Sequence, residues 1–374
     1  MTKILLTGGG TGGHIYPLAS VAKKLRQLAE IRYYGPNSSY NNYLKSENIA
    51  IEKILGAKFR RYWSWLNFID FIKIPISIIQ SLLKIALFMP DVAFSKGGTG
   101  ALPVLLACWI YRIPIIIHES DTIPGITNRL SGKLAVKIEL GWDYTKKYFP
   151  NKNTSVVGIP LREEIVNKKI NELEAKKSFN FKEKDFVILI LGGSQGAQRI
   201  NNFILKNLEL FLPKFQILHQ VGSANHQKYI ESYNSISKNW PESVKERYKC
   251  FAFFKNNISE AYSAADLIIS RSGSSIFEIA FFEKPSILIP LPESANNHQK
   301  INAIEYAKSG AGIVIEENNL SAETFLNQVE KILSDKNLYN KMSEAARLFA
   351  KPNAAEVIAK DILVISHLND TINS

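Results

Sequence analysis

The sequence contains few cysteines and lacks the common short motifs of metal and triphosphate chemistry. Only Cys108 and Cys250 occur, each in a largely apolar stretch, so neither a disulfide framework nor a paired-cysteine zinc site is expected. No D-x-D, H-E-x-x-H or G-x-x-x-x-G-K-[ST] pattern is present. These absences exclude the zinc metalloprotease and P-loop motifs, and we expect neither a bound metal nor another cofactor.

Long uncharged apolar runs are also missing. The segment before the first glycines is too short for a signal peptide, which favours a reducing cytoplasmic location. The most apolar stretch, 63–90, carries Asp70, Lys73 and Lys84, and Pro75 breaks its pattern, so it does not read as a spanning helix of roughly 20 apolar residues. It is either a buried helix with a basic edge or a helix lying on an anionic membrane surface. Basic residues outnumber acidic ones around it, with Lys58, Arg60, Arg61, Lys73 and Lys84 against Asp70.

The chain is basic, with a formal net charge of +12, which favours an anionic partner such as phospholipid or a phosphorylated substrate. No nucleic-acid-binding motif accompanies the charge, so we expect no nucleic acid partner. With 374 residues, the chain is long enough for two domains.

The first and second halves of the chain begin alike. "KILLTGGGTGGH" starts at Lys3 and "FVILILGGSQGA" at Phe186, and each joins an aliphatic run to a glycine loop. Apolar runs alternate with segments of helical length, which indicates parallel sheets with crossover helices. The predicted fold class is α/β, with two Rossmann-like doubly wound parallel-sheet domains. Further predicted strands lie within 92–98, 113–120, 266–273 and 284–292, and predicted helices include 15–29, 197–211, 322–334 and 354–370.

The expected domain boundary lies where the sequence turns polar after Gly158 and Pro160, which suit a hinge. We expect a first domain over 1–158 and a second over 159–345. A C-terminal helix within 346–374 could cross back to the first domain.

The first glycine loop, "LLTGGGTGGHIYP", follows a strand and opens a helix. Gly8, Gly10 and Gly13 fit G-x-G-x-x-G, but the predicted second strand, 31–37, ends without the acidic residue that holds a ribose. A nicotinamide dehydrogenase is therefore disfavoured. His14 lies at the helix start, where it either caps the turn or accepts a proton from a substrate hydroxyl.

Other polar loops follow strands and should lie at the same edges of the sheets. "SKGGTGALP" (95–103) and "HESDTIPGITNRL" (118–130) belong to the first half, and "SRSGSSIFE" (270–278) to the second. Backbone donors at a helix start suit a diphosphate, and Glu278 suits ribose hydroxyls or simply complements the helix dipole. Arg162 or Arg271 could neutralise a diphosphate, and Gln299 in "NNHQKINA" could bind a sugar.

Taken together, the motifs resemble the MurG-type glycosyltransferases, in the same order and over about residues 3–310. The resemblance is carried by "TGGGTGGHIYP", "SKGGTGALP", "HESDTIPGITN", "GIPLR", "LGGSQGA", "SRSGSSIFE" and "NNHQKINA". It implies a GT-B fold with a cleft between two Rossmann-like domains. It also implies transfer of N-acetylglucosamine from UDP-N-acetylglucosamine to undecaprenyl-diphospho-N-acetylmuramoyl-pentapeptide, a step of peptidoglycan synthesis.

The resemblance assigns expected roles to residues of this sequence. It implies a catalytic base among His14 and Glu119, and a backbone near Phe254 that faces the uracil. Asp121 stands where the family usually has asparagine. The residues expected to bind the donor are Thr11, Gly12, Gly13, Asp121, Asn128, Arg162, Ser194, Lys255, Ser274, Ser275, Glu278 and Gln299.

The resemblance also implies an inverting single displacement without a metal, on the cytoplasmic face of the plasma membrane. There the enzyme would be peripheral, would dock on the anionic surface that holds its polyprenyl acceptor, and could meet other cell-wall enzymes. A UDP-sugar 2-epimerase, another GT-B transferase of UDP-sugars and a non-catalytic nucleotide-binding scaffold remain alternatives.

Overall fold

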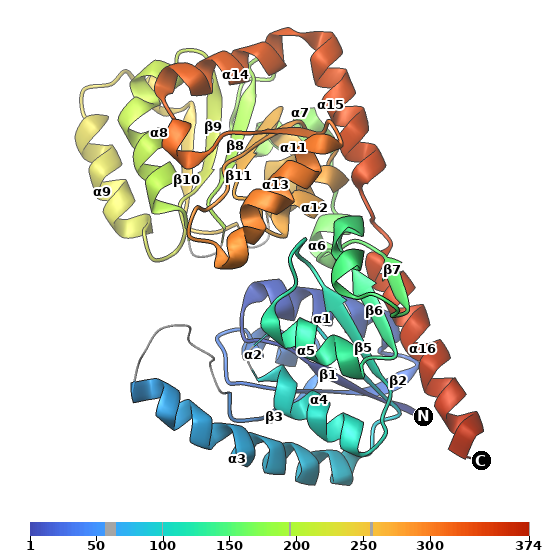
Figure 1. The fold of residues 1–374 in the computed structure, drawn as a ribbon. Helices are drawn as coiled ribbons and strands as arrows, with labels where there is room; N and C mark the ends of the chain where they lie inside the picture. Colours follow the sequence, from blue (N-terminus) through green and yellow to red (C-terminus); the bar gives the residue numbers. More distant parts are fainter. Residues whose placement is uncertain (57–64, 99, 194–195, 255–256, 374) are drawn as a thin grey trace. The chain divides into compact units, whose positions relative to one another are not determined.

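The computed structural model describes residues 1–56, 65–98, 100–193, 196–254 and 257–373. The chain forms two compact units (Figure 1). The first comprises residues 1–162 together with 351–374, and the second comprises residues 163–350. Each unit is built around its own parallel β-sheet.

The sheet of the first unit has the strand order β3-β2-β1-β4-β5-β6-β7, and every neighbouring pair is parallel. Its central strands are continuous aliphatic runs that are buried on both faces, as expected for a parallel sheet covered by helices. The strands are β1 (Thr2–Thr7), β2 (Ala29–Gly35), β3 (Ala50–Lys53), β4 (Val92–Ser95), β5 (Ile115–Glu119), β6 (Lys137–Leu140) and β7 (Thr154–Val156).

Helices cover both faces of this first sheet. Ile15 and Leu18 of α1 join Ile358 and Ile362 of α16 in one buried cluster, and Val104 of α4 belongs to the cluster on the other face. The helices of this unit are α1 (Gly12–Leu25), α2 (Asn41–Ser46), α3 (Trp65–Phe88), α4 (Ala101–Ile110), α5 (Ile126–Leu134), the 3₁₀ helix η1 (Asp143–Tyr148) and α16 (Ala354–Asn373).

The last helix, α16, is therefore part of the first unit although it follows the whole second unit in sequence. Ion pairs hold it there, between Glu356 and Lys24 at 2.9 Å and between Asp361 and Lys137 at 2.6 Å. Where the chain returns, Lys351 packs against Gly158, which has φ +82°. A side chain at Gly158 would place its Cβ 2.4 Å from that of Lys351, so glycine is required there.

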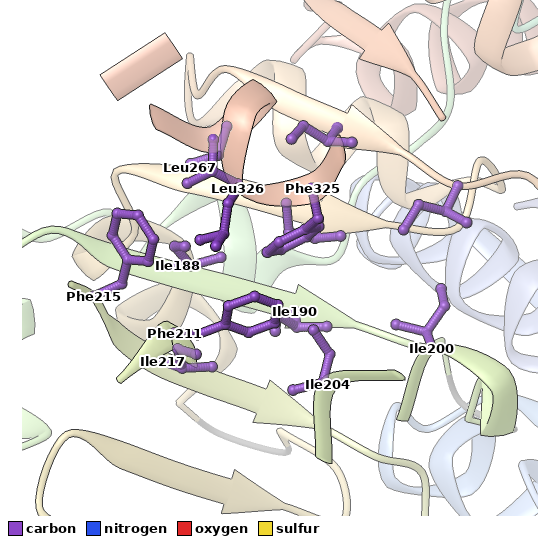
Figure 2. Packing of buried hydrophobic residues seen from close by; sticks show 14 of the residues in the cluster. Ile188, Ile190, Ile200, Ile204, Phe211, Phe215, Ile217, Leu267, Phe325 and Leu326 are labelled. Atoms are coloured by element: carbon purple, nitrogen blue, oxygen red, sulfur yellow. The ribbon is translucent and has the colours of Figure 1, made fainter. Parts of the chain in front are cut away.

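The second unit contains a six-stranded parallel sheet with the order β10-β9-β8-β11-β12-β13. One face buries isoleucines of β8 and β9 against Ile204 and Phe211 of α8 and Phe325 of α14 (Figure 2). The strands are β8 (Val187–Leu191), β9 (Gln216–Gln220), β10 (Tyr248–Phe251), β11 (Leu267–Ser270), β12 (Ser286–Leu288) and β13 (Gly312–Val314).

The helices of the second unit alternate with these strands. They are α6 (Glu163–Val166), α7 (Glu172–Ser178), α8 (Gln198–Phe211), α9 (His226–Ile236), α10 (Glu242–Lys245), α11 (Ile258–Ala264), α12 (Ser275–Phe281), η2 (Ala295–Asn297), α13 (His298–Lys308), η3 (Glu317–Asn319), α14 (Ala322–Ser334) and α15 (Lys336–Phe349). The predicted fold class, two doubly wound parallel-sheet domains, is confirmed.

Within the apolar stretch 63–90, the helix α3 continues through Pro75. A proline removes one backbone hydrogen bond, but α3 packs against α4, and the Ser77 hydroxyl donates to the carbonyls of Lys73 and Leu55, both at 2.6 Å. These contacts hold the helix together. Within the described part of the chain, every helix is too short or too polar to span a bilayer.

Candidate functional site

Two glycine loops of the first unit interlock at the carboxyl ends of β1 and β4. The two strands are neighbours in the sheet, and the Gly9 N–H donates to the Gly97 carbonyl at 2.8 Å. Gly97 and Gly98 have φ of +73° and +87°, and a Cβ at Gly98 would lie 2.8 Å from Gly9 Cα. The loops approach this closely because glycine has no side chain.

The imidazole of His14 lies between these loops. An ideal Cβ would lie 3.0 Å from His14 Nδ1 if built on Gly9, and 2.9 Å from Nε2 if built on Gly98. His14 is in the first turn of α1, and its Nδ1 is 2.8 Å from the Thr11 hydroxyl. Desolvation, reinforced by the charge of Lys96 and opposed by Asp121, lowers the pKa of His14 to about 4. The ring is therefore neutral near pH 7 and can accept a proton.

Glu119 ends β5 and organises the loop that follows it. Its carboxylate accepts from the backbone of Asp121 at 2.9 Å, the backbone of Gly125 at 3.2 Å and the amide of Asn128 at 2.9 Å. Burial and the nearby Asp121 raise the pKa of Glu119, and these hydrogen bonds oppose the rise. Both carboxylate oxygens are therefore occupied by hydrogen bonds within the loop.

Asn128 connects this loop to the glycine loop after β4. It is buried, and its amide nitrogen also donates to the His118 carbonyl at 3.1 Å. Its Oδ1 has no hydrogen-bond partner among the described residues and lies 2.3 Å from the place a Cβ of Gly97 would take. The predicted sites at His14, Glu119, Asp121 and Asn128 thus share one edge of the sheet.

Thr11, Gly12 and Gly13 form the start of α1 beside His14, with Thr11 and Gly13 exposed. Arg162, at the end of the first unit, places its guanidinium 5.1 Å from the centre of the Tyr16 ring, one turn further along α1. The guanidinium of Arg162 therefore lies near the N-terminal end of α1, the end that also carries His14.

The sequence singled out the segments that contain Lys96 and His118 but gave neither residue a role, and both are buried in the structure. Lys96 Nζ is 2.6 Å from His118 Nδ1 and also contacts the Ser120 hydroxyl, while His118 Nε2 is 2.7 Å from the Gly158 carbonyl. The available signal was the position of each residue at the carboxyl end of a fully apolar strand, where a polar side chain needs a buried partner.

In the second unit, Gln220 at the end of β9 joins the loops that follow the two neighbouring strands, β8 and β10. Its Oε1 accepts from the Phe254 N–H at 3.0 Å, and its Nε2 is 3.3 Å from the Gly193 carbonyl. This places Phe254 beside the glycine loop that precedes α8. The predicted sites Ser194 and Lys255 lie outside the described residues.

The start of α12 follows β11 at the same edge of this sheet. Ser274 is exposed at the N-cap, and Ser275 Oγ is 3.1 Å from Ser270 Oγ. Glu278 lies in the first turn and accepts from the Tyr262 hydroxyl at 2.7 Å. The Tyr262 ring stacks on Phe282 with centroids 4.9 Å apart, so the tyrosine is a fixed support for the carboxylate.

Gln299 belongs to the first turn of α13 and packs against the same strand end. Its side-chain oxygen accepts from the Leu291 N–H at 3.0 Å, and its carbonyl accepts from the Ser272 hydroxyl at 2.7 Å. Ser272 lies between β11 and α12, so Gln299 is close to the segment that leads into α12.

Arg271 does not present a free cation as the sequence suggested. Its guanidinium is buried, donates to the carbonyls of Ile289 and Pro290 at 3.0 and 3.1 Å, and pairs with Glu317 at 2.5 Å. These partners balance its charge and direct it toward the protein's own backbone. Among the described residues, no three His, Cys, Asp or Glu side chains are grouped to hold a metal ion.

Comparison with protein families identifies both units. Residues 4–139 match the glycosyltransferase family 28 N-terminal domain, and residues 187–367 match the glycosyltransferase family 28 C-terminal domain.

Two curated relatives align over almost the whole chain. The UDP-N-acetylglucosamine–N-acetylmuramyl-(pentapeptide) pyrophosphoryl-undecaprenol N-acetylglucosamine transferase of Clostridium tetani is 35% identical and covers 91% of this chain and 92% of that protein. The protein of the same name from Thermodesulfovibrio yellowstonii is 34% identical and covers 95% and 96%.

Solved structures show the same architecture. The crystal structure of Acinetobacter baumannii MurG superposes with a TM-score of 0.76 at 26% identity, covering 97% of this chain and 99% of that chain. The UDP-GlcNAc 2-epimerase of Neisseria meningitidis superposes with a TM-score of 0.68 at 15% identity, covering 97% and 100%, which shows a shared fold alone.

Proposed function

The chain belongs to glycosyltransferase family 28, and from this premise we propose that it transfers N-acetylglucosamine from UDP-N-acetylglucosamine to undecaprenyl-diphospho-N-acetylmuramoyl-pentapeptide. The observation that carries the proposal is the 35% identity to a transferase of that activity over 91% of the chain. The product is the disaccharide-linked lipid from which peptidoglycan is built.

A direct assay tests this function. Purified protein is incubated with UDP-N-acetylglucosamine labelled in the sugar, with and without the polyprenyl-linked muramyl-pentapeptide. We expect labelled lipid and UDP to form in equal amounts, and only with the acceptor. Formation of a 2-epimer from UDP-N-acetylglucosamine alone would instead support the epimerase, which is the weaker reading because the epimerase shares the fold at only 15% identity.

We assign the acceptor chemistry to the first unit. The C4 hydroxyl of the muramyl sugar would attack the anomeric carbon of the donor. The new C–O bond forms as the bond to the diphosphate breaks, which inverts the configuration. His14 would take the hydroxyl proton, because its ring is neutral and lies at the exposed start of α1. Glu119 would hold the adjacent loop and its Asp121 and Asn128 in place for the sugar.

We assign the nucleotide to the second unit. The glycine loop before α8 and the N-cap of α12 offer backbone N–H groups to a diphosphate. Glu278 would accept from the ribose hydroxyls, and the backbone at Phe254 would face the base. Gln299 would contact the donor sugar from the start of α13.

Replacing Glu278 with glutamine should weaken UDP binding about tenfold. The amide has one acceptor oxygen instead of two, so one ribose hydrogen bond of about 1.4 kcal/mol is lost. Isothermal titration calorimetry with UDP measures the change.

The matched control is Tyr262→Phe, which removes the hydroxyl donor to Glu278 and keeps the ring that stacks on Phe282. Its loss of affinity should be smaller, about two- to threefold. A Glu278→Gln protein that binds UDP as tightly as the unchanged protein would remove Glu278 from the nucleotide site.

We further propose that the outer face of α3 docks on the cytoplasmic membrane surface. The face is apolar and exposed, with Leu87 87% exposed, and Trp109 and Ile110 at the end of the adjacent α4 are also exposed. Of the basic residues that suggested an anionic surface, Lys58, Arg60 and Arg61 lie outside the described residues. Lys84 is paired with Glu52.

The double variant Leu83→Glu with Leu87→Glu should reduce binding to phosphatidylglycerol vesicles at least tenfold. Both side chains are exposed on α3, and burying one such chain in the lipid interface contributes up to roughly 1.5–3 kcal/mol. Vesicle sedimentation measures binding, and Leu348→Glu, an equally exposed change on α15 of the other unit, is the control. Equal loss in the control would argue against a specific docking face.

A further inference from the structure

A buried lysine in the first unit has no role in the reaction as proposed so far. Lys96 follows β4, and only 3% of it is exposed. Its ammonium contacts two side chains of the next strand and its loop, His118 Nδ1 at 2.6 Å and the Ser120 hydroxyl. It therefore joins the glycine loop after β4 to the end of β5 and the loop that follows Glu119.

The hydrogen bonds define the protonation of this cluster. His118 Nε2 is 2.7 Å from the Gly158 carbonyl, which can only accept, so Nε2 carries the proton and Nδ1 is the acceptor for Lys96. Burial and the charge of Lys96 lower the pKa of His118, which keeps its ring neutral. Lys96 is thus the cation of a buried chain that runs from the glycine loop to the Gly158 carbonyl.

Lys96 also lies next to the proposed base. An ideal Cβ on Gly8 would be 3.6 Å from both Lys96 Cβ and His14 Cβ, so the two side chains leave the backbone on either side of one glycine. The charged groups that act on His14 are Lys96, from the end of β4, and Asp121, from the loop after β5. Those that act on Lys96 are Glu119 and Asp121, which favour its charged form against the cost of burial.

We propose that Lys96 is a positioning residue for the transfer reaction, which fixes the loop after β5 against the glycine loops and sets a cationic side chain next to His14. This inference rests on the proposed function for its link to catalysis. If Lys96 only filled space in the core, an uncharged side chain of similar length could replace it without affecting His14. The positioning role and the purely packing role therefore predict different effects of the Lys96 charge on His14.

Two variants separate the charge from the hydrogen bonds. Lys96→Met removes both, and Lys96→Gln removes the charge but keeps an N–H donor for His118 and Ser120. The first measurement is an NMR titration of the imidazole of His14, identified by the resonance that is lost in His14→Gln. The second is the pH profile of kcat for transfer, measured with saturating substrates.

The expected direction of the change in the pKa of His14 follows from the positive charge of Lys96. In the unchanged protein the pKa of His14 is about 4, so protonation of His14 should not lower kcat above about pH 5. Burial raises the pKa of Glu119 to about 7 and lowers that of Lys96 to about 8, so any change of kcat at those pH values belongs to Glu119 and Lys96. Without Lys96 the protonated imidazole is less disfavoured, so the pKa of His14 should rise, while burial still holds it below 6.5, and the acidic limb of kcat should move to higher pH. Lys96→Gln should show the same shift and retain more of the plateau value of kcat than Lys96→Met.

An unchanged titration of His14 in the glutamine variant would overturn the proposal, even if kcat fell, because a loss of packing alone lowers kcat at every pH. The glutamine variant also decides the question if the methionine variant does not fold. The NMR titration needs no substrate. An unchanged protein that transfers no sugar would therefore refute the proposed function while leaving the test of the Lys96–His14 coupling intact.

Discussion

The His14→Ala protein is expected to lose about 10²–10⁴-fold in kcat, with little change in the affinity for UDP. The loss follows because the attacking hydroxyl would have no group to take its proton. The stability of the first unit should change little, since His14 is only half-buried and its one side-chain hydrogen bond is to the neighbouring Thr11. Steady-state kinetics with the lipid-linked acceptor measures kcat, and calorimetry measures UDP binding.

The control for this variant is His367→Ala, an exposed histidine on α16 at a distance in sequence from every proposed site. It should keep normal turnover. If folded His14→Ala protein retained near-normal kcat, His14 would not be the base, and Glu119 would become the next candidate despite its three hydrogen bonds.

Replacing Gly98 with alanine should also lower kcat, by at least tenfold, because it displaces the imidazole of His14. The residue has φ +87°, which costs an L-residue roughly 1–2 kcal/mol. The new Cβ would lie 2.8 Å from the Gly9 backbone and 2.9 Å from His14 Nε2, so the ring or the loop must move. Turnover should fall and the melting temperature should drop by a few degrees.

Gly125→Ala provides the comparison for Gly98→Ala. Gly125 also borders the site, but it has φ −63°, and nothing lies within 4 Å of a Cβ built on it. Its N–H, which donates to Glu119, is kept in alanine. We expect near-normal kcat and stability for this variant. If both alanine variants behaved alike, the close contact at Gly98 would not be what positions His14.

The fold was readily predicted because its signal is local. The runs ending at Thr7, Ser95 and Leu191 are short, mostly apolar and followed within two residues by glycine, and each is a largely buried parallel strand. The helix predicted over 322–334 has those bounds in α14. The uninterrupted course of α3 through Pro75 could not be inferred locally, because its packing against α4 and the hydrogen bond from Ser77 to Leu55 depend on residues outside the helix.

The surroundings of the charged side chains could not be predicted in the same way. Arg271 follows a strand in a loop rich in serine and resembles an anion ligand, but its partner Glu317 is far along the chain. Lys96 lies in a glycine-rich loop, where a lysine is ordinarily solvated, and only the adjacent strand β5 reveals that it is buried. Whether a single charged residue is buried, paired or free depends on partners distant in sequence, which a local sequence pattern does not specify.

The return of α16 to the first sheet has a consequence for biosynthesis. Ile358 and Ile362 belong to the same buried cluster as Ile4 and Leu6, so the apolar layer around β1 stays incomplete until the final helix has left the ribosome. Residues 163–350 form a continuous stretch with its own core, which can close earlier. We therefore expect the second unit to complete its core before the first, the reverse of the usual order, in which the amino-terminal part matures first.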